Sequence, residues 1–294
     1  MAANSLAGGN EARSRQGSKF YFKPALTYTE RTASRFSARI LPLGALFSVA
    51  GPGIVVHDIS HLPALLGFLN SLTFTALIEL CLGAGDSVSS GTAARHYTAG
   101  MLGQLPVPDV RTLGSLSELS WKTADLFLND SCNLETSTLF ARIPLDLNQA
   151  NTLRKVAELS LRDAEERLLQ AIEYSWELEK TITNLLNVPL EDVFRVTGPH
   201  PGSYPVNTAT DEQIRLLYNQ GIEQLIESVA NKIGSSRQIV VKSYVADRRL
   251  ELVAHALSIQ PREIVDARRR QQLVPEELVE EMRQTLISLA VGLA

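Results

Sequence analysis

The sequence predicts an α+β protein, a mixed unit followed by a mostly helical region with one long amphipathic helix. Residues 20–56 carry aromatic and β-branched residues between prolines and glycines, as short strands do. Residues 148–187 carry apolar side chains at three- and four-residue steps with charged residues between them, which indicates an amphipathic helix. With 294 residues, 45% of them hydrophobic and 20% charged, the chain has the composition of a globular protein with one or two domains.

Changes in composition divide the chain into four segments. The N-terminal residues include glycine, serine and asparagine and predict a flexible start, while Pro106 and Pro108 should stop regular structure near residue 110. The expected segments are a flexible lead-in at 1–12, a target-recognition-like α+β unit at 13–112, a connector at 113–147 and a helical region at 148–294.

An apolar stretch at residues 62–82 is nearly long enough to cross a bilayer. Pro63, Asn70 and Glu79 interrupt it, and a carboxylate near one end is costly in lipid. No basic cluster flanks the stretch to orient it in a membrane. The prediction is therefore a buried helix with no membrane contact, followed by a glycine- and serine-rich loop at 83–110.

The region after the long helix should begin with a loop. Residues 196–210 are rich in proline and glycine. Thr210 and Asp211 are suited to cap the helix that we expect at 212–233, since their side-chain oxygens accept hydrogen bonds from free backbone N–H groups.

Residues 248–270 predict two short helices around a turn at Ser258–Pro261. Three consecutive arginines, Arg268–Arg270, give the second helix a basic end. This pattern leaves a helix-turn-helix DNA reader open. A plain helical hairpin with a solvated charged end is the favoured interpretation.

Cysteine use and the N-terminal residues predict a cytoplasmic protein. Cys81 and Cys132 make no disulfide framework and fit no close-spaced zinc pattern, so a reducing compartment is the simplest setting. Residues 1–19 lack the apolar core of a secretory signal peptide.

A glycine pattern at Gly83–Gly91 raises the possibility of a cofactor loop. Methyltransferases hold S-adenosylmethionine on a glycine turn between a strand and a helix, because glycine lets the backbone approach the ligand. Here the preceding residues have the pattern of a helix end, and the following residues are poor helix formers. A stand-alone S-adenosylmethionine-dependent methyltransferase that uses this loop stays an alternative function.

Other candidate motifs are incomplete. His57 and His61 stand four residues apart, the spacing of two metal ligands on one helix face, but no further ligand cluster accompanies them. Asp58 stands where metalloproteases carry glutamate, and Pro63 follows almost at once. Asn187–Leu190 lacks the paired prolines and the aromatic residue with which amino-methyltransferases hold a flipped base. The sequence therefore predicts no metal site and no catalytic residue.

Basic residues are concentrated near the N-terminus of an acidic chain. Residues 1–56 hold seven basic and two acidic residues, a net charge of +5, although the whole chain carries −4. Such asymmetry favours contact with a polyanion. Residues 19–39 add hydroxyl groups, which hydrogen-bond to phosphate oxygens as lysine and arginine neutralise them. If the segment begins as a strand, Lys19, Tyr21 and Lys23 share one face and the phenylalanines between them turn to the core.

Arginine recurs every four residues in the same stretch, at Arg31, Arg35 and Arg39. This spacing aligns the three on a helix, and an even spacing also keeps them on one face of a strand. Arginine contacts phosphates and can read guanine through its fork of donors. A half-buried strand with a solvated basic face explains the stretch equally well from composition alone.

Short motifs follow one another in a characteristic order along residues 13–110. They are Tyr21–Thr27, Pro42–Gly44, Gly51–Pro52, Leu65–Ser71 and residues 96–110, with a further segment at 286–294. This order resembles the region after the catalytic domain in large adenine-specific DNA methyltransferases of phage-defence and restriction-modification systems, the BREX-type, PglX-like group. Ala25 stands where that family usually has glycine.

The resemblance implies recognition of double-stranded DNA by a region downstream of an N6-adenine methyltransferase domain. In that family the S-adenosylmethionine loop and the Asn-Pro-Pro-aromatic motif lie upstream, so we expect this chain to be a fragment or a split subunit. It should bind no cofactor itself, require a separate catalytic domain or subunit, and transfer no methyl group alone. The expected DNA contacts are Lys19, Tyr21, Lys23, Tyr28, Arg31, Arg35 and Arg39. A helical protein-interaction module that uses the 148–187 stripe is the second alternative.

Overall fold

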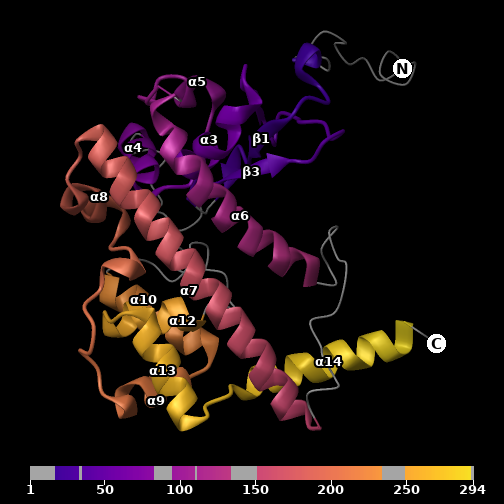
Figure 1. Ribbon diagram of the computed structural model, residues 1–294, viewed down its shortest axis with the longest axis vertical. Helices are drawn as coiled ribbons and strands as arrows, with labels where there is room; N and C mark the ends of the chain where they lie inside the picture. Colours follow the sequence, from indigo (N-terminus) through magenta and orange to yellow (C-terminus); the bar gives the residue numbers. More distant parts are fainter. Residues whose placement is uncertain are drawn as a thin grey trace.

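A small antiparallel sheet and a mostly helical remainder confirm the predicted α+β class (Figure 1). The long helix α7, Leu153–Leu186, confirms the expected amphipathic helix and runs along much of the molecule, from the N-terminal unit to the C-terminal helices. The computed structural model describes residues 17–32, 35–82, 95–109, 111–133, 151–233 and 249–292.

Two antiparallel sheets form, and four of their strands lie within residues 20–56, where the sequence predicts β structure; the fifth lies in the stretch 83–110 that was expected to be a loop. In the three-stranded sheet β1 lies between β3 and β4, and Thr27 of β1 faces Arg39 on one side and Gly53 on the other. The second sheet is a single pair, β2 with β5, in which Arg31 faces His96. The strands are β1 (Ala25–Tyr28), β2 (Arg31–Thr32), β3 (Ala38–Leu41), β4 (Gly53–Ile54) and β5 (Arg95–His96).

The apolar stretch at 62–82 is buried as predicted, but it forms two helices instead of one. Helix α3 (Leu62–Leu69) and helix α4 (Leu72–Cys81) are bent by 72° at a short break. The break occurs because the Ser71 hydroxyl caps α4 by accepting from the Phe74 N–H, at 3.0 Å. Within the described ranges no single helix is long and apolar enough to cross a membrane, although this bent pair together reaches that length and composition.

The remaining elements are mostly helical. They are η1 (Ser18–Phe20), η2 (Ile59–His61), α5 (Ala99–Leu102), η4 (Thr112–Ser115), α6 (Leu116–Asn133), α8 (Leu190–Thr197), η5 (Pro201–Ser203), α9 (Asp211–Tyr218), α10 (Ile222–Ile233), α12 (Arg249–Leu257), α13 (Pro261–Gln271) and α14 (Glu276–Gly292). Helix α6 lies in the stretch expected to be a connector, and it packs against α3 and α7.

The helix expected at 212–233 is also divided. Thr210 is its N-cap, as predicted, and forms a reciprocal capping box with Gln213. The helix ends at Tyr218 and resumes at Ile222, so the prediction of one continuous helix is wrong. The Arg249 guanidinium explains the interruption, because it donates to the carbonyl oxygens of Tyr218 and Gln220, at 2.6 and 2.5 Å.

Two hydrophobic cores share helix α7. Its C-terminal half contributes Leu178 and Ile182 to the core that holds the sheet, α3, α4 and α6. Its N-terminal half contributes Leu169 to the core formed by α9, α10, α12 and α13. The apolar side of α7 is therefore covered on both halves, which is the default expectation for such a stripe.

Candidate nucleic-acid interface

The first predicted contact segment, residues 19–23, is not a strand. Residues Ser18–Phe20 form a 3₁₀ turn, and Phe22 has a positive φ of 64°, which an extended strand does not allow. Phe22 is 60% exposed, so the predicted burial of the phenylalanines is wrong. Tyr21 packs edge-on against Phe47, with the ring centroids 5.0 Å apart.

Lys19 and Lys23 nevertheless reach the surface. Both are exposed, and their Nζ atoms lie 4.9 and 5.6 Å from the centre of the Phe20 ring. An ammonium over an aromatic face is attracted by the ring quadrupole and keeps most of its hydration. The turn therefore presents two cations on one exposed aromatic ring.

Tyr28 is a core residue and is not available as the predicted supporting contact. It is 1% exposed on β1 and packs against Phe36, with ring centroids 5.2 Å apart. Burial, helped by the charge of Glu30, raises the pKa of its hydroxyl to about 12. Among the described residues that hydroxyl has no hydrogen-bond partner. The prediction failed because the strand turns Tyr28 toward α3 together with Leu26.

The three regularly spaced arginines lie on different elements, so the prediction of one shared face is wrong. Arg31 is exposed on β2, and Arg39 is exposed on β3, where its Nη2 donates to the Thr29 hydroxyl at 2.9 Å. Arg35 follows β2 outside any regular element and is half-buried. Burial raises the pKa of Glu179 and lowers that of His200, and the positive charge of Arg35 opposes the first shift and adds to the second, so Arg35 lies near both buried groups.

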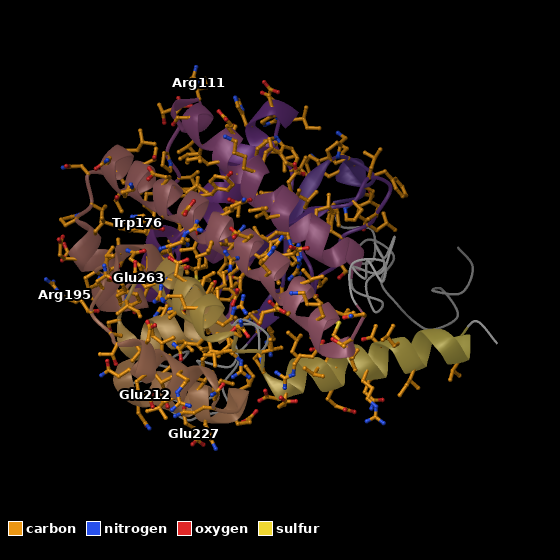
Figure 2. The ribbon with its side chains drawn as sticks, turned by 60° about the horizontal axis from the view of Figure 1, so that its bottom comes forward. Arg111, Trp176, Arg195, Glu212, Glu227 and Glu263 are labelled. Atoms are coloured by element: carbon orange, nitrogen blue, oxygen red, sulfur yellow. The ribbon has the colours of Figure 1, made fainter. Side chains whose placement is uncertain are left out.

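Four exposed cations of this region are distinguished by the absence of acidic partners. Within the described ranges, Lys19, Lys23, Arg31 and Arg39 form no ion pair. Exposed cations elsewhere are commonly paired, as Arg195 is with Asp192 at 2.9 Å on α8. Arg195 lies at the periphery of the molecule (Figure 2). The positive charge of residues 19–39 is therefore available to an external anion.

The basic end of α13 offers no comparable surface. The turn between α12 and α13 lies where the sequence predicts it, and the second helix begins at Pro261. All three terminal arginines are engaged with carboxylates at 2.7 Å: Arg268 with Glu165, Arg269 with Glu166 and Arg270 with Asp211. The helix pair is thus a hairpin that packs on α7 and α9. These ion pairs would have to break before the three arginines could contact DNA.

Other candidate motifs yield no site in the described chain. Gly83–Gly91 lies outside the described residues. Among the described residues no group of three His, Cys, Asp or Glu side chains is placed to hold a metal ion. Asp58, between the two spaced histidines, caps the short η2 turn by accepting from the Ser60 N–H at 2.9 Å. Asn187 ends α7 in the left-handed conformation, with φ of 51°, so its role there is structural.

Sequence reasoning missed a buried carboxylate that joins α7 to α4. Glu179 is 2% exposed and accepts hydrogen bonds from the backbone N–H groups of Leu72 and Thr73, at 2.7 and 2.8 Å, and from the Thr73 hydroxyl. It therefore binds the N-terminus of α4, where negative charge is favoured. Burial raises the pKa of Glu179, and these hydrogen bonds act against that shift.

A second buried carboxylate, Glu165, joins α7 to α13 and α9. Glu165 is 3% exposed and Arg268 is 2% exposed, and the arginine Nε lies 2.7 Å from the nearer carboxylate oxygen. The Tyr218 hydroxyl donates to the same carboxylate at 3.0 Å. In the sequence these residues look like members of a solvated charged face, because a one-dimensional pattern does not show which glutamate has a buried partner.

His200 was also not singled out from the sequence. Its ring stacks on Trp176 with centroids 5.4 Å apart, and its Nδ1 accepts from the Gly202 N–H at 3.0 Å. With Nδ1 as acceptor, the proton lies on Nε2, which is 3.1 Å from the Ser175 hydroxyl. Burial, with a smaller effect of Arg35, lowers the pKa of His200 to about 4. The imidazole is thus a neutral packing group at the turn before α9.

The chain matches no protein-family model, and a search of curated proteins finds no match. The methyltransferase resemblance therefore rests on the order of the sequence motifs, and the function has to be argued from the chain itself.

Proposed function

We propose that this chain binds double-stranded DNA through the exposed cations of residues 19–39, as the target-recognition portion of an N6-adenine-specific DNA methyltransferase. The observation that supports the proposal is the set of four exposed, unpaired cations at Lys19, Lys23, Arg31 and Arg39. Elsewhere carboxylates neutralise many of the exposed cations, so these four are the charges most available to a polyanion. The order of motifs in residues 13–110 supports the enzyme class and a role in phage defence or restriction-modification.

The four exposed cations suit different kinds of DNA contact. Lysine is a compact charge that neutralises a phosphate, which fits Lys19 and Lys23 beside the Phe20 ring. Arginine presents a planar fork that binds phosphate or a guanine edge in a bidentate manner. The guanidinium of Arg31 donates no hydrogen bond to any described residue, whereas Arg39 donates one to the Thr29 hydroxyl. We therefore assign base contact to Arg31 first and phosphate contact to the others.

Methyl transfer belongs to a separate catalytic domain or subunit in this proposal. That partner would bind S-adenosylmethionine and flip the adenine, while this chain would select the DNA site. Purified chain mixed with DNA and labelled S-adenosylmethionine should transfer no methyl group. Transfer by the chain alone would contradict the assigned role.

The proposal is tested by the salt dependence of DNA binding. A labelled 20-base-pair duplex should bind with an affinity that falls steeply with salt, with a logarithmic slope of about −3.6 if each of the four cations neutralises one phosphate. The double variant Arg31→Ala with Arg39→Ala should flatten that slope by about 2 units. Binding that is absent at low salt, or a slope that the double variant leaves unchanged, would contradict the proposal.

A further inference from the structure

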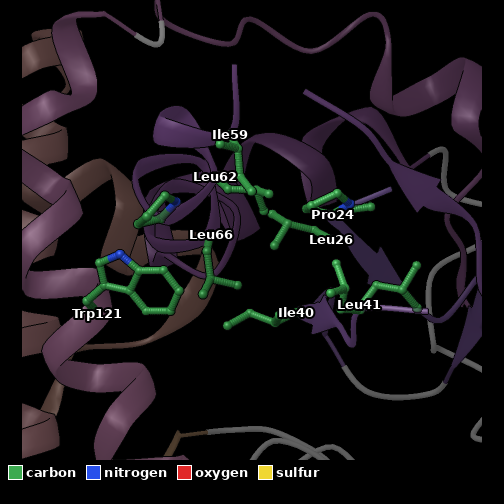
Figure 3. A pocket seen from close by; sticks show the side chains of 11 residues that line it. Pro24, Leu26, Ile40, Leu41, Ile59, Leu62, Leu66 and Trp121 are labelled. Atoms are coloured by element: carbon green, nitrogen blue, oxygen red, sulfur yellow. The ribbon is translucent and has the colours of Figure 1, made fainter. Parts of the chain in front are cut away.

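An apolar pocket opens beside the outer edge of β3. Its volume is about 250 Å³. The pocket is formed by Leu26, Leu62, Leu66, Ile40, Leu43 and Trp121, with Ile40 between the sheet and the tryptophan of α6 (Figure 3). Leu43 is 81% exposed and Trp121 is 50% exposed, so the mouth of the pocket faces solvent. Large apolar side chains that stay exposed around a pocket indicate a binding surface.

The backbone of Ile40 points to the free edge of the sheet. Alternate residues of a strand direct their N–H and C=O groups to opposite edges. On the central strand β1, the Tyr28 N–H donates toward β4, to the Pro52 carbonyl at 3.4 Å, so Thr27 directs its groups to β3. The backbone N–H and C=O of its partner Arg39 therefore point toward β1. The backbone groups of Ala38 and Ile40, on either side of Arg39, point to the free edge of the sheet.

Asn70 already occupies the first of these two outward positions. The Ala38 N–H donates to Asn70 Oδ1 and the Asn70 Nδ2 donates to the Ala38 carbonyl, both at 3.0 Å. The amide thus imitates one residue of a neighbouring strand. The outward groups of Ile40, the next position along β3 and a lining residue of the pocket, bond to none of the described residues. An extended backbone is the partner that satisfies an N–H and a C=O spaced in this way.

Charge near the pocket favours an acidic partner. Lys23 and Arg39 are exposed, directly precede the lining residues Pro24 and Ile40, and are among the cations without a carboxylate. Asp58, which precedes the lining residue Ile59, keeps its negative charge while it caps η2, so the two cations outnumber this acid. Acidic side chains on either side of an inserted apolar residue would meet these cations.

We propose that the edge of β3 and the adjoining pocket bind an extended, acidic peptide segment of a partner protein. The segment would add a strand by pairing its backbone with Ile40 and would place one aliphatic side chain in the pocket. The volume suits such a side chain and is smaller than that of a site for a drug-sized ligand. The site uses β3, α3, α6 and the cations Lys23 and Arg39, so peptide and DNA would compete for these two cations, but peptide binding does not require DNA binding.

The test uses random heptapeptides displayed on phage as the probe and the full chain as bait. Enriched sequences should place an aliphatic residue among Asp and Glu. One such peptide, resynthesised with a fluorescent label, should bind with an anisotropy change, and N-methylation of the backbone nitrogen that pairs with Ile40 should weaken binding about tenfold, because it removes one hydrogen bond and blocks strand pairing.

A matched pair of protein variants locates the site. Leu43→Glu, at the mouth of the pocket, should weaken binding of that peptide about tenfold or more, since it adds repulsion as well as removing apolar area. Leu80→Glu, a similarly exposed leucine on α4 at 73%, should leave the affinity within about twofold. The proposal would be overturned by no enrichment over a bait-free control, by equal binding of every N-methylated peptide, or by equal effects of the two variants.

Discussion

Glu165 and Glu179 each place a carboxylate inside a hydrophobic core, where an unpaired charge is costly. Glu179 is compensated by the free N–H groups at the start of α4, and Glu165 by Arg268 and Tyr218. Both residues are therefore contacts that hold one particular helix against α7. The sequence shows them only as acids in an amphipathic helix, because their partners lie 53 or more positions away.

Removal of the Glu179 carboxylate should unfold the N-terminal half of the molecule more readily. Glu179→Ala leaves the Leu72 and Thr73 N–H groups buried without an acceptor, and we expect a loss of about 3 kcal/mol in the free energy of unfolding. Urea unfolding followed by circular dichroism measures this loss. Glu177→Ala is the matched control, because Glu177 is exposed two residues earlier on α7 and pairs only with Lys180 among the described residues. Equal midpoints for the two variants would contradict the assigned role of Glu179.

His200 should make the stability of the fold depend on pH. Its pKa is lowered to about 4 in the folded protein, against an ordinary value of 6.5, so the unfolded chain binds a proton more readily between these values. The contribution of neutral His200 to the free energy of unfolding is therefore full above pH 6.5 and is lost as the pH falls toward 4. The difference of about 2.5 pKa units corresponds to about 3 kcal/mol.

The variant His200→Asn isolates this effect. Asparagine keeps an acceptor for the Gly202 N–H but does not titrate. It should be less stable than the parent at pH 7.5, because the Trp176 stack is lost, and its free energy of unfolding should depend less on pH between 6.5 and 4.5. Urea titrations of both proteins across this range provide the check. Parallel pH profiles would show that His200 is protonated equally in the folded and unfolded states.

The regular spacing of apolar residues predicted the position of α7. The stripe predicted a helix at 148–187, and the observed bounds are Leu153–Leu186. Periodicity did not predict the divisions inside 62–82 and 212–233. The first division depends on Ser71, which caps the helix that follows it. The second depends on Arg249 of α12, which donates to the Tyr218 carbonyl oxygen. The first signal is local and visible in the sequence, whereas the second exists only in three dimensions.

The contact between α7 and α13 includes the buried ion pair of Glu165 with Arg268. Arg268→Met leaves the Glu165 charge buried beside one hydroxyl, and we expect a loss of about 4 kcal/mol in the free energy of unfolding. The triple variant Glu165→Leu, Arg268→Met and Tyr218→Phe replaces the whole polar set by apolar groups of similar size. Its unfolding free energy should recover by about 2 kcal/mol or more relative to Arg268→Met. A triple variant less stable than the single one would mean that the ion pair itself stabilises the helix contact.

The distribution of charge over the whole molecule decides where an anion can bind, and the net charge of −4 does not show it. Many exposed cations of the helical region have acidic partners within the same or a neighbouring helix, as in Arg215 with Glu212 and Arg283 with Glu280. The cations of 19–39 have none among the described residues. The sequence identified this stretch from composition, and the structure places four of its seven predicted contacts on the surface. It could not show that Tyr28 turns inward, because alternation depends on the position at which β1 begins.

DNA binding by residues 19–39 is tested by comparing two variants with the same change in net charge. One replaces Lys19, Lys23, Arg31 and Arg39 by alanine, and the other replaces four exposed, paired cations, Lys155, Arg195, Arg215 and Arg283. Circular dichroism verifies that both are folded, and fluorescence anisotropy measures their affinity for the same duplex at 100 mM salt. We predict at least about a tenfold loss for the first variant and a change within about threefold for the second. Equal losses would mean that only net charge matters, and no loss in the first variant would contradict DNA binding by residues 19–39.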